Sequence, residues 1–316
     1  MSRVNKVTKT TENIVQVEED IIDLREIFYA IWRGKLIVIS TTIVFAIASV
    51  IYALNQPNIY RSAALLSPVV DSPGGGINSL ANQFGGLASI AGISLGNSGG
   101  VDKVSLAIQI MQSRQFVSSF VDKYKIKPEL MAVEGWDLHS NTLIYAEEVY
   151  DPKSGKWLRE VESPMMPEPS NQEAYKEFLK VFSVEKSKET GLVSVSVHHY
   201  SPHIAKKWVD ALIFEINENM RNRELIEANK SINFLREQLQ DTDVSQMKTV
   251  LYKLLEEQTK QVMFTNVRDE FAFKTIDPAL VMEKKAKPNR ALICILGTFV
   301  GAMLGVFFII FRFLFK

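Results

Sequence analysis

The sequence has little of what most enzymes and nucleic-acid-binding proteins need. Its 316 residues include one cysteine and four histidines, and 36 basic residues balance 36 acidic ones to a formal net charge of +0. One cysteine excludes a disulfide framework and a cysteine-based metal site. Without net positive charge the chain lacks the field that attracts phosphate backbones, so we expect no nucleic-acid partner. The patterns G-x-x-x-x-G-K-[ST] and G-x-G-x-x-G are also absent, and we expect no cofactor.

One short pattern favours catalysis. Residues 92–96 read GISLG, and Gly92, Ser94 and Gly96 fit the G-x-S-x-G turn that presents a nucleophilic serine between a strand and a helix. The preceding GGLASIA lacks the β-branched residues of a buried strand, and the following NSGG cannot start a helix. In a stretch so rich in glycine and serine the match arises easily by chance. We therefore predict that Ser94 is not catalytic.

The histidines do not predict a metal site. His198, His199 and His203 form the one histidine cluster. Adjacent residues on a strand point to opposite faces, and Pro202 separates the first two from any helix that contains His203. The pattern indicates surface residues at the end of a strand.

Two long uncharged runs are the strongest signal in the chain. Residues 36–54 and 291–311 contain no charged side chain. The shorter run has about 19 residues and as a helix reaches ~28 Å, enough to cross the hydrocarbon core of a bilayer. Because residues 1–35 form a polar leader and the run exceeds the core of a signal peptide, we predict an uncleaved anchor. Both runs are predicted to span a membrane.

The basic residues beside the spans predict the topology. Arg25, Arg33 and Lys35 precede the first span and Arg61 follows it, which favours a cytoplasmic amino terminus. The opposite signal comes from four basic residues before the second span, Lys284, Lys285, Lys287 and Arg290. The first span usually dominates, so we expect both termini in the cytoplasm and the loop outside.

Apolar and polar residues alternate in several stretches between the spans, and this pattern predicts a small mixed sheet. The predicted strands cover residues 60–66, 181–184, 192–198 and 272–276. In the third, Val193, Val195 and Val197 share one face. Residues 104–124 are predicted to be helical, and residues 18–35 read as an amphipathic helix that leads into the first span.

A long helix is predicted to follow the third strand. Ser201-Pro202 supplies an N-cap and a proline at the first helical position, and apolar residues then recur every three or four positions for ~40 residues, or ~60 Å. The DTD sequence at 241–243 interrupts the pattern, which restarts toward Val267. The sequence leaves open whether the two helices form a hairpin or a kinked rod. The predicted fold class is α+β, with two transmembrane helices flanking a domain that combines a small mixed sheet and a long extended helix.

Small residues line one side of the second span. Gly297, Gly301 and Gly305 recur every four residues, which allows another helix to approach closely in lipid. The partner could be a second copy, the first span or another membrane protein. We expect Gly301→Leu to disturb this packing and Gly301→Ala to have almost no effect.

The order of these pieces resembles a known family. The stretches EDIIDLREIFYAIWRGK, GGLASIAGISLG, GLVSVSV, SPHIAKKW, IDPA and KPNRALICILGTFVGAMLG together are similar to the chain-length determinant (Wzz) family. The resemblance covers nearly the whole chain from about Val17. It implies a polysaccharide co-polymerase of the bacterial inner membrane that is not an enzyme, with an α/β base, a long periplasmic helix and protomers assembled into a ring.

The resemblance also implies a function and partners. A co-polymerase of this family sets the modal length of a lipid-linked surface glycan, here lipopolysaccharide O-antigen, by acting with a separate polymerase, and contact with the lipid-linked glycan itself is compatible with that role. Related co-polymerases carry or pair with a cytoplasmic tyrosine kinase, which we do not expect here, since the sequence ends five residues after Phe311. The alternative is a two-span receptor with a periplasmic sensing domain.

The resemblance completes the predicted organisation. Residues 1–35 form a cytoplasmic segment, 36–54 the first span, 55–290 the periplasmic domain, 291–311 the second span and 312–316 a cytoplasmic tail. Pro288, at the approach to the second span, joins the glycine stripe as a predicted helix-packing or polymerase contact. A glycine-rich segment of the base is predicted to include Gly85, Gly86, Gly92 and Gly96.

Overall fold

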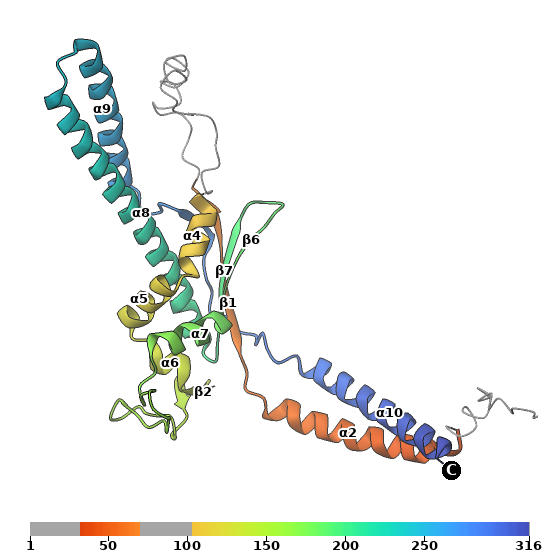
Figure 1. Cartoon of the computed structure of the whole chain (residues 1–316). Helices are drawn as coiled ribbons and strands as arrows, with labels where there is room; N and C mark the ends of the chain where they lie inside the picture. Colours follow the sequence, from red (N-terminus) through yellow and green to blue (C-terminus); the bar gives the residue numbers. More distant parts are fainter. Residues whose placement is uncertain (1–31, 70–102, 316) are drawn as a thin grey trace, which may run out of the picture. The chain divides into compact units, whose positions relative to one another are not determined.

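The computed structural model describes residues 32–69 and 103–315 (Figure 1). The chain divides into two compact units. The span unit comprises the chain up to Gln56 and from Asn289 onward, and the main unit comprises Pro57–Pro288. Each unit is described on its own below.

The span unit contains α2 (Lys35–Asn55) and α10 (Arg290–Leu314). The elements of the main unit are, in chain order, β1 (Tyr60–Pro68), α4 (Lys103–Met111), α5 (Arg114–Tyr124), α6 (Lys127–Met131), β2 (Val133–Asp137), β3 (Thr142–Tyr145), β4 (Tyr150–Asp151), β5 (Lys156–Trp157), α7 (Asn171–Val181), β6 (Phe182–Lys186), β7 (Val193–His199), α8 (Pro202–Asp241), α9 (Ser245–Val267) and β8 (Phe273–Asp277). The predicted α+β fold class, with two long apolar helices flanking a domain of strands and long helices, is confirmed.

The central sheet has the strand order β6-β7-β1-β8. Its first and last strands along the chain, β1 and β8, are neighbours, so the sheet joins segments from both ends of the main unit. The sheet was expected to be mixed, and all its pairings among the described strands are antiparallel. Hydrophobic alternation reveals which residues form strands and only weakly favours antiparallel pairing, because the direction depends on which distant segments meet.

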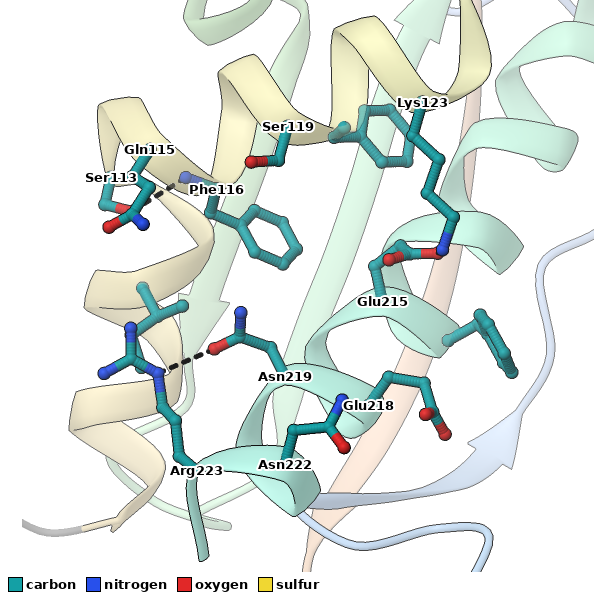
Figure 2. A pocket seen from close by; sticks show the side chains of 13 residues that line it. Ser113, Gln115, Phe116, Ser119, Lys123, Glu215, Glu218, Asn219, Asn222 and Arg223 are labelled. Carbon is teal, nitrogen blue, oxygen red and sulfur yellow. Dashed lines mark hydrogen bonds and ion pairs between the residues drawn. The ribbon is translucent and has the colours of Figure 1, made fainter. Parts of the chain in front are cut away.

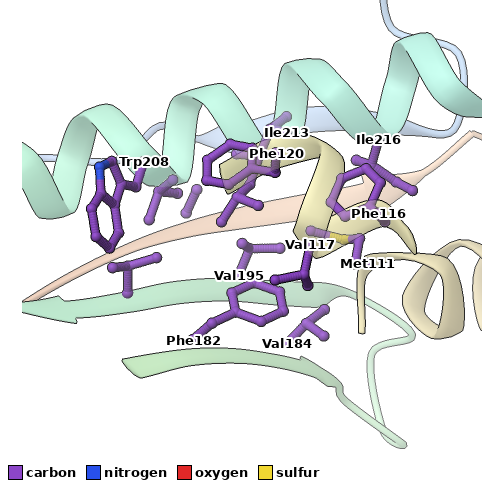
Figure 3. Close-up of a cluster of buried hydrophobic side chains, with 14 of the residues drawn as sticks. Met111, Phe116, Val117, Phe120, Phe182, Val184, Val195, Trp208, Ile213 and Ile216 are labelled. Carbon is purple, nitrogen blue, oxygen red and sulfur yellow. The ribbon is translucent and has the colours of Figure 1, made fainter. Parts of the chain in front are cut away.

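The core lies where α4, α5 and α8 pack against the strands (Figure 3). The predicted valine face of β7 is confirmed, because Val193, Val195 and Val197 are completely buried. α8 contributes Trp208 and Leu212 to the same cluster, as its three-to-four spacing predicts. Burying each of these large side chains stabilises the fold by roughly 1.5–3 kcal/mol, so this cluster is the main source of stability.

The predicted helix over 104–124 is broken into α4 and α5. The break occurs because the Ser113 hydroxyl accepts a hydrogen bond from the Phe116 backbone N–H at 3.3 Å and so starts a new helix. α5 then lies against α8, where Lys123 Nζ is 2.6 Å from Glu215 Oε1 (Figure 2). The Tyr124 hydroxyl donates to the same carboxylate at 2.8 Å. Burial, and then that hydrogen bond, raise the pKa of Tyr124 to about 12.

One buried amide attaches β8 to α8. The Asn217 side chain is 5% exposed. Its oxygen accepts from the backbone N–H groups of Ala272 and Phe273 at 2.7 and 2.9 Å, and its nitrogen donates to the carbonyls of Ile213 and Phe273 at 3.1 and 3.2 Å. All the hydrogen-bonding capacity of the amide is therefore used to hold the chain as it returns to the sheet.

The two long helices form a hairpin, which settles the question that the sequence left open. α8 ends at Asp241, and after the 242–244 turn α9 runs back beside the second half of α8 (Figure 1). Gln261 of α9 donates to the Glu224 carboxylate of α8 across the hairpin. The chain turns because Thr242 and Val244 both adopt extended backbone conformations, which end one helix and begin the next.

Candidate functional site

The two long apolar helices pack side by side within the span unit (Figure 1). α2 has 21 residues, and α10 has 25. Both are long and apolar enough to cross a membrane, and the rest of the chain buries few of their side chains. α10 starts where the Asn289 side-chain oxygen accepts from the Leu292 backbone N–H at 3.3 Å. The exposed apolar faces suit contact with lipid or with further helices.

The glycine stripe of α10 faces α2. A Cβ atom added at Gly301 would lie 2.6 Å from Phe45 Cβ and 3.2 Å from Thr42 Cα. One added at Gly305 would lie 2.9 Å from Val38 Cα, and one at Gly297 would overlap the Ser49 side chain. The three glycines thus form the glycine seam, the line along which the backbone of α10 approaches α2 too closely for any larger residue.

Small residues of α2 complete the seam. Gly297 meets Ser49, and Gly305 meets Thr41. The Ser49 hydroxyl donates to the Ala46 carbonyl at 2.8 Å, and the Thr41 hydroxyl donates to Ile37 at 3.0 Å, so neither polar group is left unsatisfied in an apolar layer. These α2 residues were not singled out from the sequence. Their recurrence with Phe45 at four-residue intervals is the signal that could have revealed them, although the same run contains other small residues such as Ser40, Ala46 and Ala48.

The expectation that alanine is tolerated at Gly301 is wrong in this packing. Even a methyl group there would come within 2.6 Å of Phe45 Cβ, a distance that real Cβ atoms essentially never show. Phe45 Cβ is fixed to the α2 backbone, so α2 itself has to shift. We now expect Gly301→Ala to have an effect smaller than that of leucine, but measurable.

Pro288 lies where the chain leaves the main unit. Just before it, the backbone N–H groups of Ala286 and Lys287 donate to the Ile59 carbonyl at 2.8 and 3.1 Å, and the Ile59 N–H donates back to Lys287 at 2.9 Å. Ile59 follows the end of α2 by four residues, and Pro288 precedes α10 by two. The chain therefore enters and leaves the main unit at one point, and Pro288 is positioned beside this bridge. Its contact with a polymerase remains a prediction.

The histidine cluster differs from its prediction at one position. His199 continues the buried face of β7 and is 5% exposed, so it is not a surface residue. Its Nδ1 accepts from the Ser201 backbone N–H at 3.0 Å, which places the proton on Nε2, the donor to the Glu129 carbonyl at 2.9 Å. The period of two that marks the valine face also places His199 on it. Within the described residues, no group of three His, Cys, Asp or Glu side chains is arranged to hold a metal ion.

His199 makes the stability of the main unit depend on pH. Burial lowers the pKa of His199 below its usual 6.5. The unfolded chain then binds the proton at a higher pH than the folded chain, so we expect stability to be constant above about pH 6.5 and to fall as the pH drops below it. Thermal unfolding of the full-length protein in detergent, from pH 7.5 to 5, measures this.

The control for this pH dependence is a second histidine of the same cluster. His203 is exposed, so His203→Gln should leave the loss of stability intact, whereas His199→Gln should reduce it. Burial and the nearby Lys287 and Arg61 also lower the pKa of His198, which contributes in the same direction. A midpoint whose pH dependence is identical in wild type and His199→Gln would contradict the assignment.

Some predicted residues lie outside the described part of the chain. They are Gly85, Gly86, Gly92 and Gly96 of the glycine-rich segment, Ser94 of the GISLG pattern, and the amphipathic stretch before residue 32. These predictions stand as they were made from the sequence.

The fold and the two paired apolar helices are those of a two-span α+β protein. Comparison with known families narrows this class. Residues 20–124 match the model of the chain length determinant protein, Wzz, and residues 235–314 match the model of the G-rich domain on putative tyrosine kinase, GNVR. The two matches include both spans. The predicted resemblance to the Wzz family is confirmed over residues 20–124.

Two solved structures resemble this chain, but with low sequence identity and low TM-scores. A full-length bacterial polysaccharide co-polymerase is 13% identical, covering 93% of this chain and 97% of that chain at a TM-score of 0.34. A fragment of WzzB, a polysaccharide co-polymerase from Salmonella Typhimurium, is 11% identical, covering 73% and 100% at a TM-score of 0.29. Such scores do not establish a shared fold, and the resemblance is carried by the two domain models. The chain matches none of the curated proteins with which it was compared.

Proposed function

We propose that this chain regulates the modal chain length of a lipid-linked surface polysaccharide, the O-antigen of lipopolysaccharide, by acting with a separate polymerase. The observation that carries the proposal is the match to the chain-length determinant model, which extends across the first span into the main unit. The chain performs no chemistry of its own in this proposal. It acts by holding the polymerase, the growing glycan or both.

The glycine seam supports a role inside the membrane. Because α10 approaches α2 along one face, the opposite side of α10 is left exposed, with Phe299, Met303 and Phe307 each at least 59% exposed. In the proposed topology the protein lies in the bacterial inner membrane, both termini are cytoplasmic, and residues 55–290 are periplasmic. The exposed side of α10 then offers the polymerase a surface at the depth of the bilayer.

Deletion of the gene tests the function. We expect the strain to keep making the polysaccharide but to lose its modal length, because the polymerase remains and only its length control is removed. The measurement is the distribution of glycan lengths on a gel. Complete loss of polymer would indicate a polymerase or export role, and an unchanged distribution would exclude length control.

Self-association is part of the proposal. α9 buries Thr265 alone among its residues. Large apolar side chains remain exposed along it, namely Met247, Tyr252, Met263, Phe264 and Val267. Phe264 and Val267, three residues apart, share one side of the helix and are 62% and 81% exposed. An apolar helix surface of this kind in a water-exposed domain is typical of contact with another protein, here a second copy.

A pair of charge-introducing substitutions tests this contact. We expect Phe264→Glu/Val267→Glu to shift the full-length protein in mild detergent from oligomers to smaller species, because each glutamate must be desolvated in the interface. The control, Thr249→Glu/Thr259→Glu, adds the same charge at exposed polar positions of α9 and should assemble like wild type. Multi-angle light scattering gives the masses. A wild type that is strictly monomeric, or a Glu variant that assembles normally, would contradict the proposal.

A further inference from the structure

α5 and α8 enclose a pocket of about 340 Å³ in the main unit (Figure 2). Its floor is apolar and consists of Ile110, Phe116 and Phe120, which belong to the core. Its walls are polar: Ser113, Gln115 and Ser119 lie on the α5 side, and Asn219, Asn222 and Arg223 line the α8 side. The volume and the combination of an apolar floor with convergent polar groups are those of a small-ligand site.

The charges in this pocket nearly cancel. Lys123 and Arg223 are its cations, and Glu215 and Glu218 are its anions. Lys123 is paired with Glu215 at 2.6 Å, and Glu218 is paired with Arg221 just outside the pocket. These pairs leave Arg223 as the one unpaired charge among the lining residues, which is little attraction for a polyanion, whereas an uncharged ligand meets no electrostatic penalty.

The uncharged polar side chains of the pocket suit a ligand with many hydroxyl groups. Arg223 Nε donates to Asn219 Oδ1 at 2.8 Å, which orients that amide and leaves its NH₂ group and the two guanidinium Nη groups available (Figure 2). The side chains of Gln115, Ser119 and Asn222 make no hydrogen bond within the described part of the chain. Amides and serine hydroxyls both donate and accept, as a ligand with many hydroxyl groups requires.

An aromatic ring stands at the edge of the pocket. Phe214 lines it and is 56% exposed, whereas Leu212, Ile213 and Ile216 of the same helix are buried. Sugar rings have one face made of C–H groups, and such a face packs on an aromatic ring while the hydroxyls at its rim reach polar side chains. The pocket therefore combines the two kinds of contact that a saccharide uses.

We propose that the pocket between α5 and α8 binds a short, uncharged segment of saccharide, the glycan whose length the protein controls. Phe214 packs on the sugar ring, and Asn219, Asn222 and Gln115 bind its hydroxyls. The identity of the glycan rests on the proposed function, but the binding chemistry rests on the pocket alone. A site on the main unit gives the protein a direct hold on the chain that the polymerase extends.

A binding measurement with matched variants tests this. The probe is a set of oligosaccharides, of one to a few repeat units, released by partial acid hydrolysis from the bacterium's own surface polysaccharide. Full-length protein in lipid nanodiscs is mixed with them, and saturation-transfer NMR reports contact with the sugar ring protons. Wild type should bind, and Phe214→Ala/Asn222→Ala should lower the affinity at least ten-fold. Excess inorganic phosphate should not displace the sugar.

The control variant is Phe234→Ala/Asn233→Ala. Phe234 is 59% exposed and Asn233 is exposed, on the same helix but outside this pocket, so the control removes the same chemical groups. It should bind like wild type. Equal affinity in both double variants, no binding by wild type, or displacement by phosphate would overturn the proposal. A change of oligomer mass in the pocket variant alone would identify the pocket as a contact between copies and would also overturn it.

The glycan length distribution of the deletion strain, taken together with the binding measurement, distinguishes failure of the pocket proposal from failure of the proposed function. If the deletion strain loses modal length and the pocket variant binds sugar like wild type, the pocket proposal fails and the function stands. If deletion leaves the length distribution unchanged while oligosaccharides bind in the pocket, the function fails and the saccharide site stands.

Discussion

Asn217→Ala is expected to destabilise the main unit by about 3 kcal/mol. The substitution leaves two backbone N–H groups and the Phe273 carbonyl buried without their side-chain partner, and each such group costs roughly 1–3 kcal/mol. For a unit of this size the midpoint of thermal unfolding should fall by roughly 6–12 °C. The β8 strand should loosen first, because Asn217 holds its start.

Hydrogen exchange measures this loosening locally. In full-length protein the backbone N–H groups of Ala272 and Phe273 should exchange on the order of 100-fold faster in Asn217→Ala, which corresponds to ~2.7 kcal/mol. The control is Asn233→Ala, an exposed asparagine on the same helix, which should not alter exchange in this segment. If Asn217→Ala and Asn233→Ala behave alike, the amide does not anchor β8.

Gly301→Leu is expected to leave the protein in the membrane and remove its control of chain length. Leucine favours membrane insertion by a few tenths of a kcal/mol, so α10 should still form. Its side chain has no room, because a Cβ atom alone would lie 2.6 Å from Phe45 Cβ. α2 and α10 must separate or rotate, which rearranges the exposed side of α10 that we propose as the polymerase contact. The measurement is the glycan length distribution at matched protein levels.

The control for Gly301→Leu is Val300→Leu. Val300 is 46% exposed and adjacent in sequence, and leucine there should leave the length distribution unchanged. Gly301→Ala should fall between the two. A normal modal length in Gly301→Leu would show that the glycine seam is not needed for function, even though it shapes the packing of the spans.

Much of the fold could be predicted because its signals are local. The uncharged runs, the valine alternation of β7 and the apolar spacing of α8 each follow from one stretch of sequence. The length of α8 was also predicted, since an N-cap, a proline and the DTD sequence mark its ends. What could not be predicted depends on which segments meet. The direction of strand pairing and the choice of a hairpin are examples.

The candidate sites show the same limit. The glycine stripe was visible within α10, but its partner on α2 lies some 250 residues earlier in the chain, so the sequence left the partner open. Asn217 looks like any polar residue in a helix until β8 is placed beside it. The pocket between α5 and α8 combines residues about 100 positions apart, and none of them forms a motif.

An exchange of chain-length proteins between strains tests the central claim most directly. A strain that has a polymerase but lacks its own chain-length protein is given this chain, or a different chain-length protein, at matched expression, and the glycan length distribution is measured. The account predicts a modal length that follows the supplied protein while the polymerase stays the same. A distribution that is the same with either protein, and is therefore set by the polymerase alone, would contradict it.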